Sequence, residues 1–593
     1  MKNPIPNLTY FYGQLGYRLV ILIFTSILVG LLDGLGITMF LPLLELVSDS
    51  SAHVSPEKLG NLSFLLRGLQ SFGFGLTLNV VLLTMFVFFI FKGLATFAER
   101  YMRVVYQQYF IAKIRLTYLD ALRDYDFRAF VTADAGLIQN SITGEVERVM
   151  QAFRSYGTIL QQLAMMLTYL GLAFMASPEF AVLIAVGGVL SNFLFSLLYK
   201  KTKVLSSELV QRNHTFQGYV IQAVSFFKYL KATAYNEEYT DFLKRNVIDI
   251  EKTNKKMGVL NSIMLGFREP LMIGIVVVVI LVQIYFIGGA LGTIILSLLF
   301  FYRGLTSLTA LQTAYNQFLG FSGSLENMSS FTNELKRHTT LIGNKRFIQF
   351  RSKIILDNVS FSYDGINLIL NKIDLVIYRN ETLALVGESG SGKTTLANLL
   401  CGLLKPDSGQ LLVDGENIVD YDVRTLQKRI GYITQDPVIF DDTVWNNVTF
   451  WAEKNSKNSL KFYDSLKKAH IIDFIDGLSS KGETRLGNNG ITLSGGQRQR
   501  ISIARELFKE VDFLFMDEAT SALDSETERS IQNNIDELKG QFTIVMIAHR
   551  LSTIRNANRV VVLNQGSIES IGTYDEVYGT SKLFKNMVEL QEI

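Results

Sequence analysis

The distribution of apolar residues constrains this chain most strongly. Long uncharged runs such as residues 19–32 (LVILIFTSILVGLL) and 273–289 (IGIVVVVILVQIYFIGG) occur only before about residue 335. A bilayer core of roughly 30 Å requires about 20 apolar residues per helix, so these runs are typical of membrane spans. The remainder of the sequence has the mixed composition of an ordinary α/β protein. The change in composition therefore predicts a membrane domain at 1–335, a linker at 336–352 and a second domain at 353–593.

The apolar runs predict six membrane spans, at residues 18–46, 76–98, 157–176, 180–199, 271–288 and 291–318. The connections between spans differ in basic residues: 99–136 holds 6 Lys and Arg and 200–256 holds 11, whereas 47–75 holds only Lys58 and Arg67. Because Lys and Arg are enriched in cytoplasmic loops, both termini and both long connections are expected in the cytoplasm. We expect a multi-pass protein of the cytoplasmic (inner) membrane.

Charge and cysteine content exclude other classes of protein. The formal net charge is only +3, which is too small to indicate a nucleic-acid-binding protein. The single cysteine, Cys401, excludes an internal disulfide framework and a cysteine-cluster metal site. We expect Cys401 to be a packed, reduced thiol.

The segment LALVGESGSGKTTL at residues 383–396 is typical of a strand, a tight turn and the start of a helix. Its spacing matches G-x-x-x-x-G-K-[ST], in which backbone N–H groups surround phosphates and the helix directs its positive end at them. We expect Lys393 to reach the β- and γ-phosphates of ATP and Thr394 to bind Mg²⁺. The nucleotide-binding residues predicted here are Gly387, Glu388, Ser389, Gly390, Ser391, Gly392, Lys393, Thr394 and Thr395.

Two further motifs carry chemistry. The segment DFLFMDE at residues 512–518 is an apolar strand ending in two carboxylates, where Asp517 would hold Mg²⁺ through water and Glu518 would polarise the attacking water. Between the motifs lies LSGGQ, residues 493–497, followed by a sequence with helical spacing. Taken alone, LSGGQ indicates no more than a tight turn. Its candidate phosphate-binding residues are Ser494, Gly495, Gly496 and Gln497.

In this order and spacing, the three motifs resemble the nucleotide-binding domain of ABC transporters. Smaller motifs extend the resemblance: SFSYDG supplies Tyr363, similar to the aromatic residue that stacks on adenine, and GYITQD supplies Gln435, similar to the glutamine that contacts Mg²⁺. SALD supplies Asp524, which would face the dimer partner, and IAHRLST supplies His549, similar to the switch histidine at the γ-phosphate. The fold implied is an all-α six-helix transmembrane domain of the exporter type followed by an α/β ATPase domain with a phosphate loop.

The resemblance also implies how such a chain works. Two ATPase domains would enclose two ATP molecules, each between the phosphate loop of one chain and LSGGQ of the other. A homodimer would have two competent ATP sites. A heterodimer with another chain is the alternative assembly. One segment departs from the family pattern: TRLGNNG, Thr484 to Gly490, has Asn488 where exporters commonly carry an acid. Its contact with the cytoplasmic helices is therefore expected to be built differently.

In the exporter fold, each long cytoplasmic connection ends in a short coupling helix. The matching stretches are Asp124 to Gly136 and Arg212 to Val220. The aromatic residues Phe127, Phe130 and Phe216 are candidates for insertion into the ATPase surface. Packing within the helical hairpins is the alternative for each of them.

Four ionisable residues within or near the spans are candidates for a substrate cavity: Asp33, Lys92, Arg268 and Arg303. Such residues are costly in a membrane and usually face the interior of the bundle. Lys92 and Arg268 alternatively extend to the inner headgroups, and Arg303 alternatively pairs with Asp33. Arg and Lys suit phosphate, so an anionic headgroup is the predicted ligand of this cavity.

These ionisable residues, the segment SITGEV (Ser141 to Val146) and the outer segment 47–75 resemble one subgroup, the bacterial flippases of lipid-linked oligosaccharides for protein N-glycosylation. That resemblance implies a polyprenyl-diphosphate oligosaccharide as substrate. The alternatives are a multidrug or general lipid exporter of the same fold, and a channel or regulator that ATP only switches. Neighbouring Asp517 and Glu518 favour real ATP turnover over the last alternative.

Overall fold

The computed structural model describes residues 5–40, 42–43, 46, 64–71, 73, 75, 77–133, 135–176, 178–282, 285, 291–340, 342–517, 525–548 and 550–592. The chain divides into two compact units. The first comprises residues 1–125 and 132–339, and the second comprises residues 126–131 and 340–593. The first unit thus ends four residues beyond the predicted limit of the membrane domain, because its last helix continues to Arg337.

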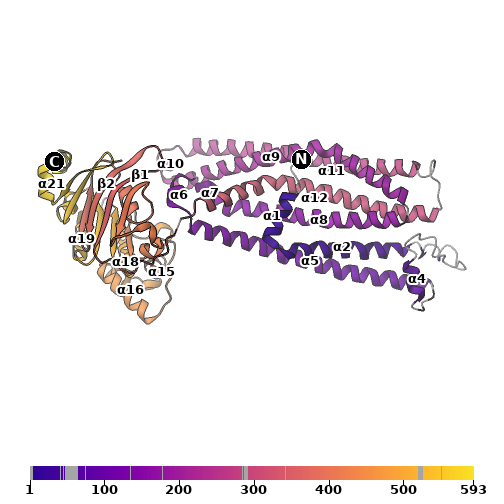
Figure 1. Ribbon diagram of the computed structural model, residues 1–593, viewed down its shortest axis with the longest axis horizontal. Coiled ribbons are helices and arrows are strands. Elements are labelled where there is room, and N and C mark those ends of the chain that lie inside the picture. Colours follow the sequence, from indigo (N-terminus) through magenta and orange to yellow (C-terminus); the bar gives the residue numbers. More distant parts are fainter. Residues whose placement is uncertain are drawn as a thin grey trace. The chain divides into compact units, whose positions relative to one another are not determined.

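Long helices build the first unit, and Figure 1 shows them running side by side. Helix α5 has 46 residues, a length of about 69 Å at 1.5 Å per residue, so it is more than twice as long as a bilayer core is thick. The helices are α1 (Ile5–Leu15), α2 (Tyr17–Thr38), α4 (Phe64–Ser71), α5 (Leu78–Arg123), α7 (Ala135–Ile142), α8 (Gly144–Ala176), α9 (Pro178–Ser225), α10 (Phe227–Ala232), α11 (Asn236–Val282) and α12 (Leu291–Arg337).

Within the described residues, three stretches are long and apolar enough to cross a membrane: Tyr17–Thr38, Leu78–Arg123 and Gly136–Met175. They overlap the first three predicted spans. The fourth and sixth predicted spans lie in α9 and α12, and the fifth lies partly in α11 and partly outside the described residues. Large apolar side chains of α5 such as Leu83, Phe86 and Phe97 are 63–70% exposed, as expected where lipid or another chain covers them.

The second unit is built on two sheets. A four-stranded antiparallel sheet has the order β2-β1-β4-β5, and a six-stranded sheet has the order β10-β9-β3-β8-β7-β6, in which β9, β3, β8, β7 and β6 pair in parallel. The strands are β1 (Lys353–Ser362), β2 (Leu368–Tyr378), β3 (Thr382–Val386), β4 (Ser408–Val413), β5 (Glu416–Asn417), β6 (Ile430–Ile433), β7 (Phe513–Asp517), β8 (Thr543–Ile547), β9 (Arg559–Asn564) and β10 (Ser567–Gly572).

The central strands of the six-stranded sheet indicate that both of its faces are covered. Strands β3 and β8 are buried at every position, which is typical of parallel strands between layers of helices. The helices of the unit, shown with the strands in Figure 1, are α6 (Phe127–Thr132, of which residues 127–131 belong here), α13 (Lys393–Leu400), α14 (Val423–Gln427), α15 (Val444–Thr449), α16 (Ser456–Lys468), α17 (Ile472–Asp476), α18 (Gly495–Phe508), α19 (Ser525–Leu538), α20 (Leu551–Arg555), α21 (Tyr574–Thr580) and α22 (Lys582–Glu592).

Candidate functional site

The predicted phosphate loop connects β3 to α13, and two of its positions accept only glycine. Gly387 has φ +149°, and a Cβ atom there would lie 2.2 Å from the carbonyl oxygen of Leu563. Gly392 has φ +101°, and a Cβ atom there would lie 2.7 Å from Cδ2 of Leu370. The loop therefore turns where a side chain would collide with β9 or β2, which keeps its backbone close to the sheet.

The lysine of the loop is held in place by the loop itself. Lys393 is buried, and its Nζ donates to the carbonyl oxygens of Gly387 at 2.9 Å and Glu388 at 2.8 Å. Ser391 is also buried, and its Oγ has no hydrogen-bond partner within the described part of the chain. An ammonium held beneath a glycine-rich loop with a spare hydroxyl fits a polyphosphate. Glu388, Ser389, Gly390 and Thr394 are exposed, whereas Thr395 is buried.

The parallel register brings Asp517 to the same edge of the sheet as the phosphate loop. Asp517 pairs with Ile547 of β8, and Ile547 pairs with Leu385 of β3, so the three residues form one row. Gly387 follows Leu385 by two residues, and β6 ends two residues before Gln435 on the other side of β7. Carboxyl ends of parallel strands meet at one edge, and neighbouring strands are about 4.8 Å apart. Oxygen ligands from Thr394, Asp517 and Gln435 are the type that Mg²⁺ prefers.

The loop that carries Tyr363 is fixed by a carboxylate. Asp364 accepts hydrogen bonds from the backbone N–H groups of Ile366 and Asn367 and from the Ser362 hydroxyl, each at 2.8 Å. These donors hold the pKa of Asp364 well below its ordinary value. Tyr363 is half-buried and packs edge-on against Phe361 with ring centroids 5.0 Å apart. The loop that carries the aromatic side chain is thus fixed by hydrogen bonds.

LSGGQ forms the start of α18. The Ser494 hydroxyl accepts from the N–H of Gln497 at 3.3 Å, and Gln497 Oε1 accepts from the N–H of Ser494 at 2.8 Å. This reciprocal pair is a capping box, so both side chains stabilise the helix start. Ser494 remains exposed, Gly495 is half-buried and Gly496 is buried. The exposed serine at a helix N-terminus is compatible with an anion presented from outside the chain.

Three predicted residues of the ATPase site, Glu518, Asp524 and His549, lie outside the described residues. Their chain neighbours are described: Asp517 ends β7, and Ala548 donates its N–H to the carbonyl oxygen of Leu385. The unusual segment Thr484 to Gly490 is described as well. It pairs with the loop before α15 through a bridge between Thr443 and Arg485, and Asn488 is exposed.

In the first unit, Asp33 does not pair with Arg303, the alternative to a cavity role for Arg303. Asp33 of α2 is 1% exposed and forms an ion pair with Lys92 of α5 and accepts a hydrogen bond from the Tyr169 hydroxyl of α8. The partner of Asp33 is therefore Lys92, and the amine of Lys92 is bound within the helices rather than extended to headgroups. Tyr169 was missed because nothing in an uncharged span marks which residue faces a neighbouring helix.

Arg268 is buried as well. It donates to the Thr313 hydroxyl and, at 3.3 Å, to the carbonyl oxygen of Thr309, and it lies over the ring of Phe195. Arg268 thus connects α9, α11 and α12 and does not extend toward headgroups. Arg303, by contrast, is exposed, and its neighbour Gly304 packs beside Tyr169. Of the four predicted cavity residues, Asp33, Lys92 and Arg268 bind other side chains, whereas the side chain of Arg303 is exposed.

The predicted coupling segments differ from each other. In the first, Phe127 packs against the apolar core of the ATPase unit, whereas Phe130 is 48% exposed. The second prediction is wrong in position: Arg212–Val220 lies inside the continuous helix α9, and the separate short helix is α10, Phe227–Ala232. The charged, helix-compatible sequence around Arg212 contains no break, which explains why the turn comes later, at Phe226.

Comparisons with known proteins agree with this architecture. Residues 370–521 match the family described as ABC transporter, and residues 19–306 match the ABC transporter transmembrane region. A lipid A-core flippase of Cupriavidus metallidurans is 30% identical over 512 residues, which are 84% of this chain and 85% of that protein. The heterocyst differentiation ATP-binding protein HepA of Nostoc is 31% identical over 486 residues, 81% of this chain and 77% of that protein.

The chain belongs to the ABC transporter family. A solved structure of a bacterial Atm1-family ABC exporter with ATP bound has the same fold, with a TM-score of 0.78 at 21% identity, covering 97% of this chain and 98% of that chain. The ABC transporter described here is thus an exporter-type half-transporter. It is a multi-pass membrane protein that works as a dimer, binds ATP and couples ATP hydrolysis to transport.

Proposed function

We propose that this ABC transporter flips an anionic lipid-linked saccharide, a polyprenyl-diphosphate oligosaccharide, from the inner to the outer leaflet of the cytoplasmic membrane. The observation that carries the choice of cargo is the exposed Arg303 within α12, since a guanidinium in a span suits a diphosphate. Relatives named lipid A-core flippases support a lipid as cargo. The runner-up is a multidrug or general lipid exporter of the same fold.

In the proposed ATPase site, each group has one role. Tyr363 stacks on adenine, the phosphate loop and Lys393 hold the β- and γ-phosphates, and Glu518 polarises the attacking water. Thr394, Gln435 and Asp517 would hold Mg²⁺, which supplies positive charge to the phosphate oxygens when bound. His549 would contact the γ-phosphate.

The proposed assembly is a homodimer with two such sites. Ser494, Gly495, Gly496 and Gln497 of one chain would close on the ATP held by the other, with Asp524 at the dimer contact. The exposed N-terminus of α18 supports this arrangement, because its serine is open to a ligand from another chain. Both termini and the ATPase domain would lie in the cytoplasm, which the basic residues of the long connections support.

The test is ATP-dependent flipping of a labelled polyprenyl-diphosphate glycan in proteoliposomes that contain only this chain. We expect flipping by the unmodified chain and none by Glu518→Gln, which should bind ATP without hydrolysing it. Flipping by this chain alone would also support the homodimer. Robust ATPase activity without flipping of the glycan would contradict the cargo while leaving the exporter intact, and hydrophobic drugs or other lipids would then be assayed.

A further inference from the structure

A groove of about 750 Å³ lies between α9 and α11 of the membrane unit. Its rim carries Lys200 and Lys201 of α9 and Lys252, Lys255 and Lys256 of α11, and we call it the lysine groove. Its floor is formed by the apolar side chains Val204, Leu205, Val259 and Leu260.

The groove lies where both helices change from charged to uncharged sequence. In α9, residues 180–199 contain no charged residue and Lys200 follows at once. In α11, residues 257–267 contain none and Lys256 immediately precedes them. The two helices pack side by side in the membrane unit, so the two changes coincide at one level. On α9 this level is the cytoplasmic end of the fourth predicted span, 180–199, whereas on α11 the fifth predicted span, 271–288, begins further along the helix.

The positive charge of the rim is largely uncompensated. Lys200, Lys201, Lys255 and Lys256 are exposed, and none of them forms an ion pair with another described residue. Lys252 is paired with Asp249 of its own helix at 2.9 Å. The nearby Glu251 accepts a hydrogen bond from Asn254 at 3.2 Å. These unpaired like charges raise the local positive potential, which attracts anions.

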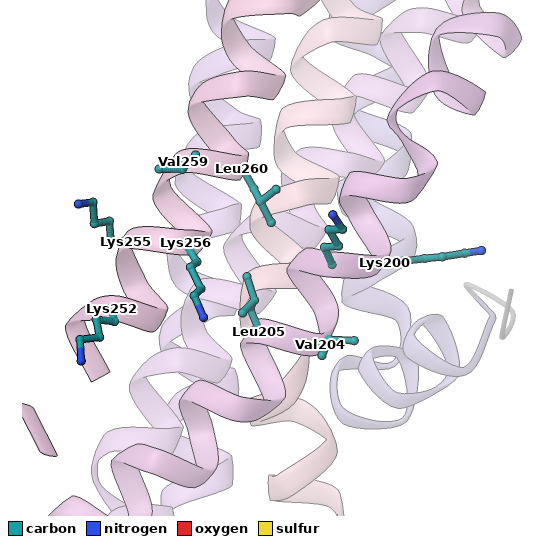
Figure 2. A pocket seen from close by; sticks show the side chains of 9 residues that line it. Lys200, Val204, Leu205, Lys252, Lys255, Lys256, Val259 and Leu260 are labelled. Atoms are coloured by element: carbon teal, nitrogen blue, oxygen red, sulfur yellow. The ribbon is translucent and has the colours of Figure 1, made fainter. Parts of the chain in front are cut away.

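Figure 2 shows how the side chains are disposed. Leu205 and Leu260 extend into the space between the two helices, and Lys256 points into the same space. Lys252 and Lys255 project from the outer side of α11. Val204 is 67% exposed and Val259 is 49% exposed, so the apolar floor is open along its length to whatever surrounds the protein. An acyl chain and a charged headgroup attached to it match this combination.

We propose that the lysine groove binds an anionic phospholipid of the inner leaflet, with an acyl chain along its apolar lining at Leu205 and Leu260 and a headgroup attracted by the surrounding lysines, of which Lys256 points between the helices. Clusters of basic residues between membrane helices on the cytoplasmic side attract acidic headgroups. The bound lipid is a component of the surrounding bilayer and not the transported cargo. The inference is therefore independent of the proposed polyprenyl-diphosphate substrate.

The experiment measures binding of fluorescent phosphatidylglycerol to the full-length protein in phosphatidylcholine nanodiscs. We expect the variant K200Q/K201Q/K255Q/K256Q to bind this lipid at least tenfold more weakly. The matched control K228Q/K231Q/K244Q/R245Q removes the same number of exposed positive charges from α10 and α11 outside the groove and should bind as the unmodified protein does. Thermal unfolding of both variants checks that they are folded.

Two further arms separate a lipid from a free anion. Inorganic phosphate at millimolar concentration should displace little of the bound phosphatidylglycerol, and V204N/V259N should weaken lipid binding while leaving all the lysines in place. Displacement by phosphate at the lipid's own affinity would show a plain anion site and overturn the proposal. Wild-type binding by the quadruple groove variant, or equal loss in its matched control, would overturn it as well.

Discussion

Arg128 of α6 forms an ion pair with Asp407, with Nη1 and Oδ1 2.9 Å apart, and its Nε donates to the carbonyl oxygen of Tyr363 at 3.0 Å. The second oxygen of Asp407 accepts from the N–H of Ser362 at 2.8 Å. A residue from the long connection between two membrane helices thus binds the carbonyl of the proposed adenine-stacking residue directly and, through Asp407, the N–H of the residue before it. This arrangement gives the connection a direct mechanical link to the nucleotide site.

The first prediction concerns this link. Arg128→Ala should leave basal ATPase activity close to that of the unmodified protein but reduce its stimulation by substrate severalfold, because ATP binding persists while the connection is released. The pair is about one third exposed, so its coupling energy should be only about 0.2–1 kcal/mol. A double-mutant cycle of Arg128→Ala and Asp407→Asn, with substrate-stimulated ATPase activity as the readout, measures this coupling energy. Additive effects of the two substitutions on that activity would show that the ion pair does not connect substrate binding to ATP hydrolysis.

The second prediction tests the phosphate loop by adding single methyl groups. G387A and G392A should weaken ATP binding more than tenfold, because each new Cβ would lie within 3 Å of β9 or β2 atoms. G390A is the matched control: it has φ +81° but open space around the Cβ, so only backbone strain of about 1 kcal/mol applies. Fluorescent ATP titration of the three variants gives the comparison. Equal affinity loss in all three would point to strain rather than collision.

The third prediction addresses the buried ion pair of Asp33 and Lys92. Removing one partner leaves a buried charge, so Asp33→Asn or Lys92→Met alone should each destabilise the membrane unit by about 3–5 kcal/mol. The double variant removes both charges and should recover most of that loss. Thermal unfolding in detergent measures all three. A double variant that is less stable than either single one would refute the pairing seen here.

Sequence reasoning succeeded where chemistry requires a fixed local spacing. The phosphate loop, the strand ending at Asp517 and the helix beginning after Ser494 each follow from a contiguous motif, and the structure has all three elements. The motifs alone do not give the order of the strands, and this order puts Leu385, Ile547 and Asp517 in one row. Only the family resemblance predicted that the motifs lie together at one edge of the sheet.

The side-chain contacts between helices were not predictable from the sequence. Whether Asp33 pairs with Arg303 or with Lys92 depends on helix rotation, and the spans carry too few charged residues to indicate it. The burial of Arg268 among Thr309, Thr313 and Phe195 had no sequence signal for the same reason. The position of α10 was missed because Phe227–Ala232 contains neither glycine nor proline to mark a turn.

The fourth prediction uses the only cysteine of the chain. Cys401 is buried, and burial raises the pKa of its thiol well above the ordinary value. An uncharged maleimide at neutral pH should therefore label the unfolded protein quickly and the folded protein slowly, with C401S as the unlabelled control. Because the raised pKa belongs to the folded state, this thiol's contribution to stability is complete below its unfolded pKa of about 8.5 and declines as the pH rises beyond it. Fast labelling of the folded protein would contradict the burial.

The last prediction separates cargo recognition from ATP hydrolysis. Arg303 is exposed, and its neighbour Gly304 lies beside Tyr169, so replacing the Arg303 side chain should disturb packing little. Arg303→Ala should lower flipping of a polyprenyl-diphosphate glycan at least tenfold and leave basal ATPase activity nearly unchanged, because the guanidinium would contact cargo and not nucleotide. Arg303→Lys keeps the charge but loses the bidentate geometry, so its flipping rate should lie between those of the unmodified protein and Arg303→Ala. Equal loss of flipping and basal ATPase activity in Arg303→Ala would instead assign the residue a structural role.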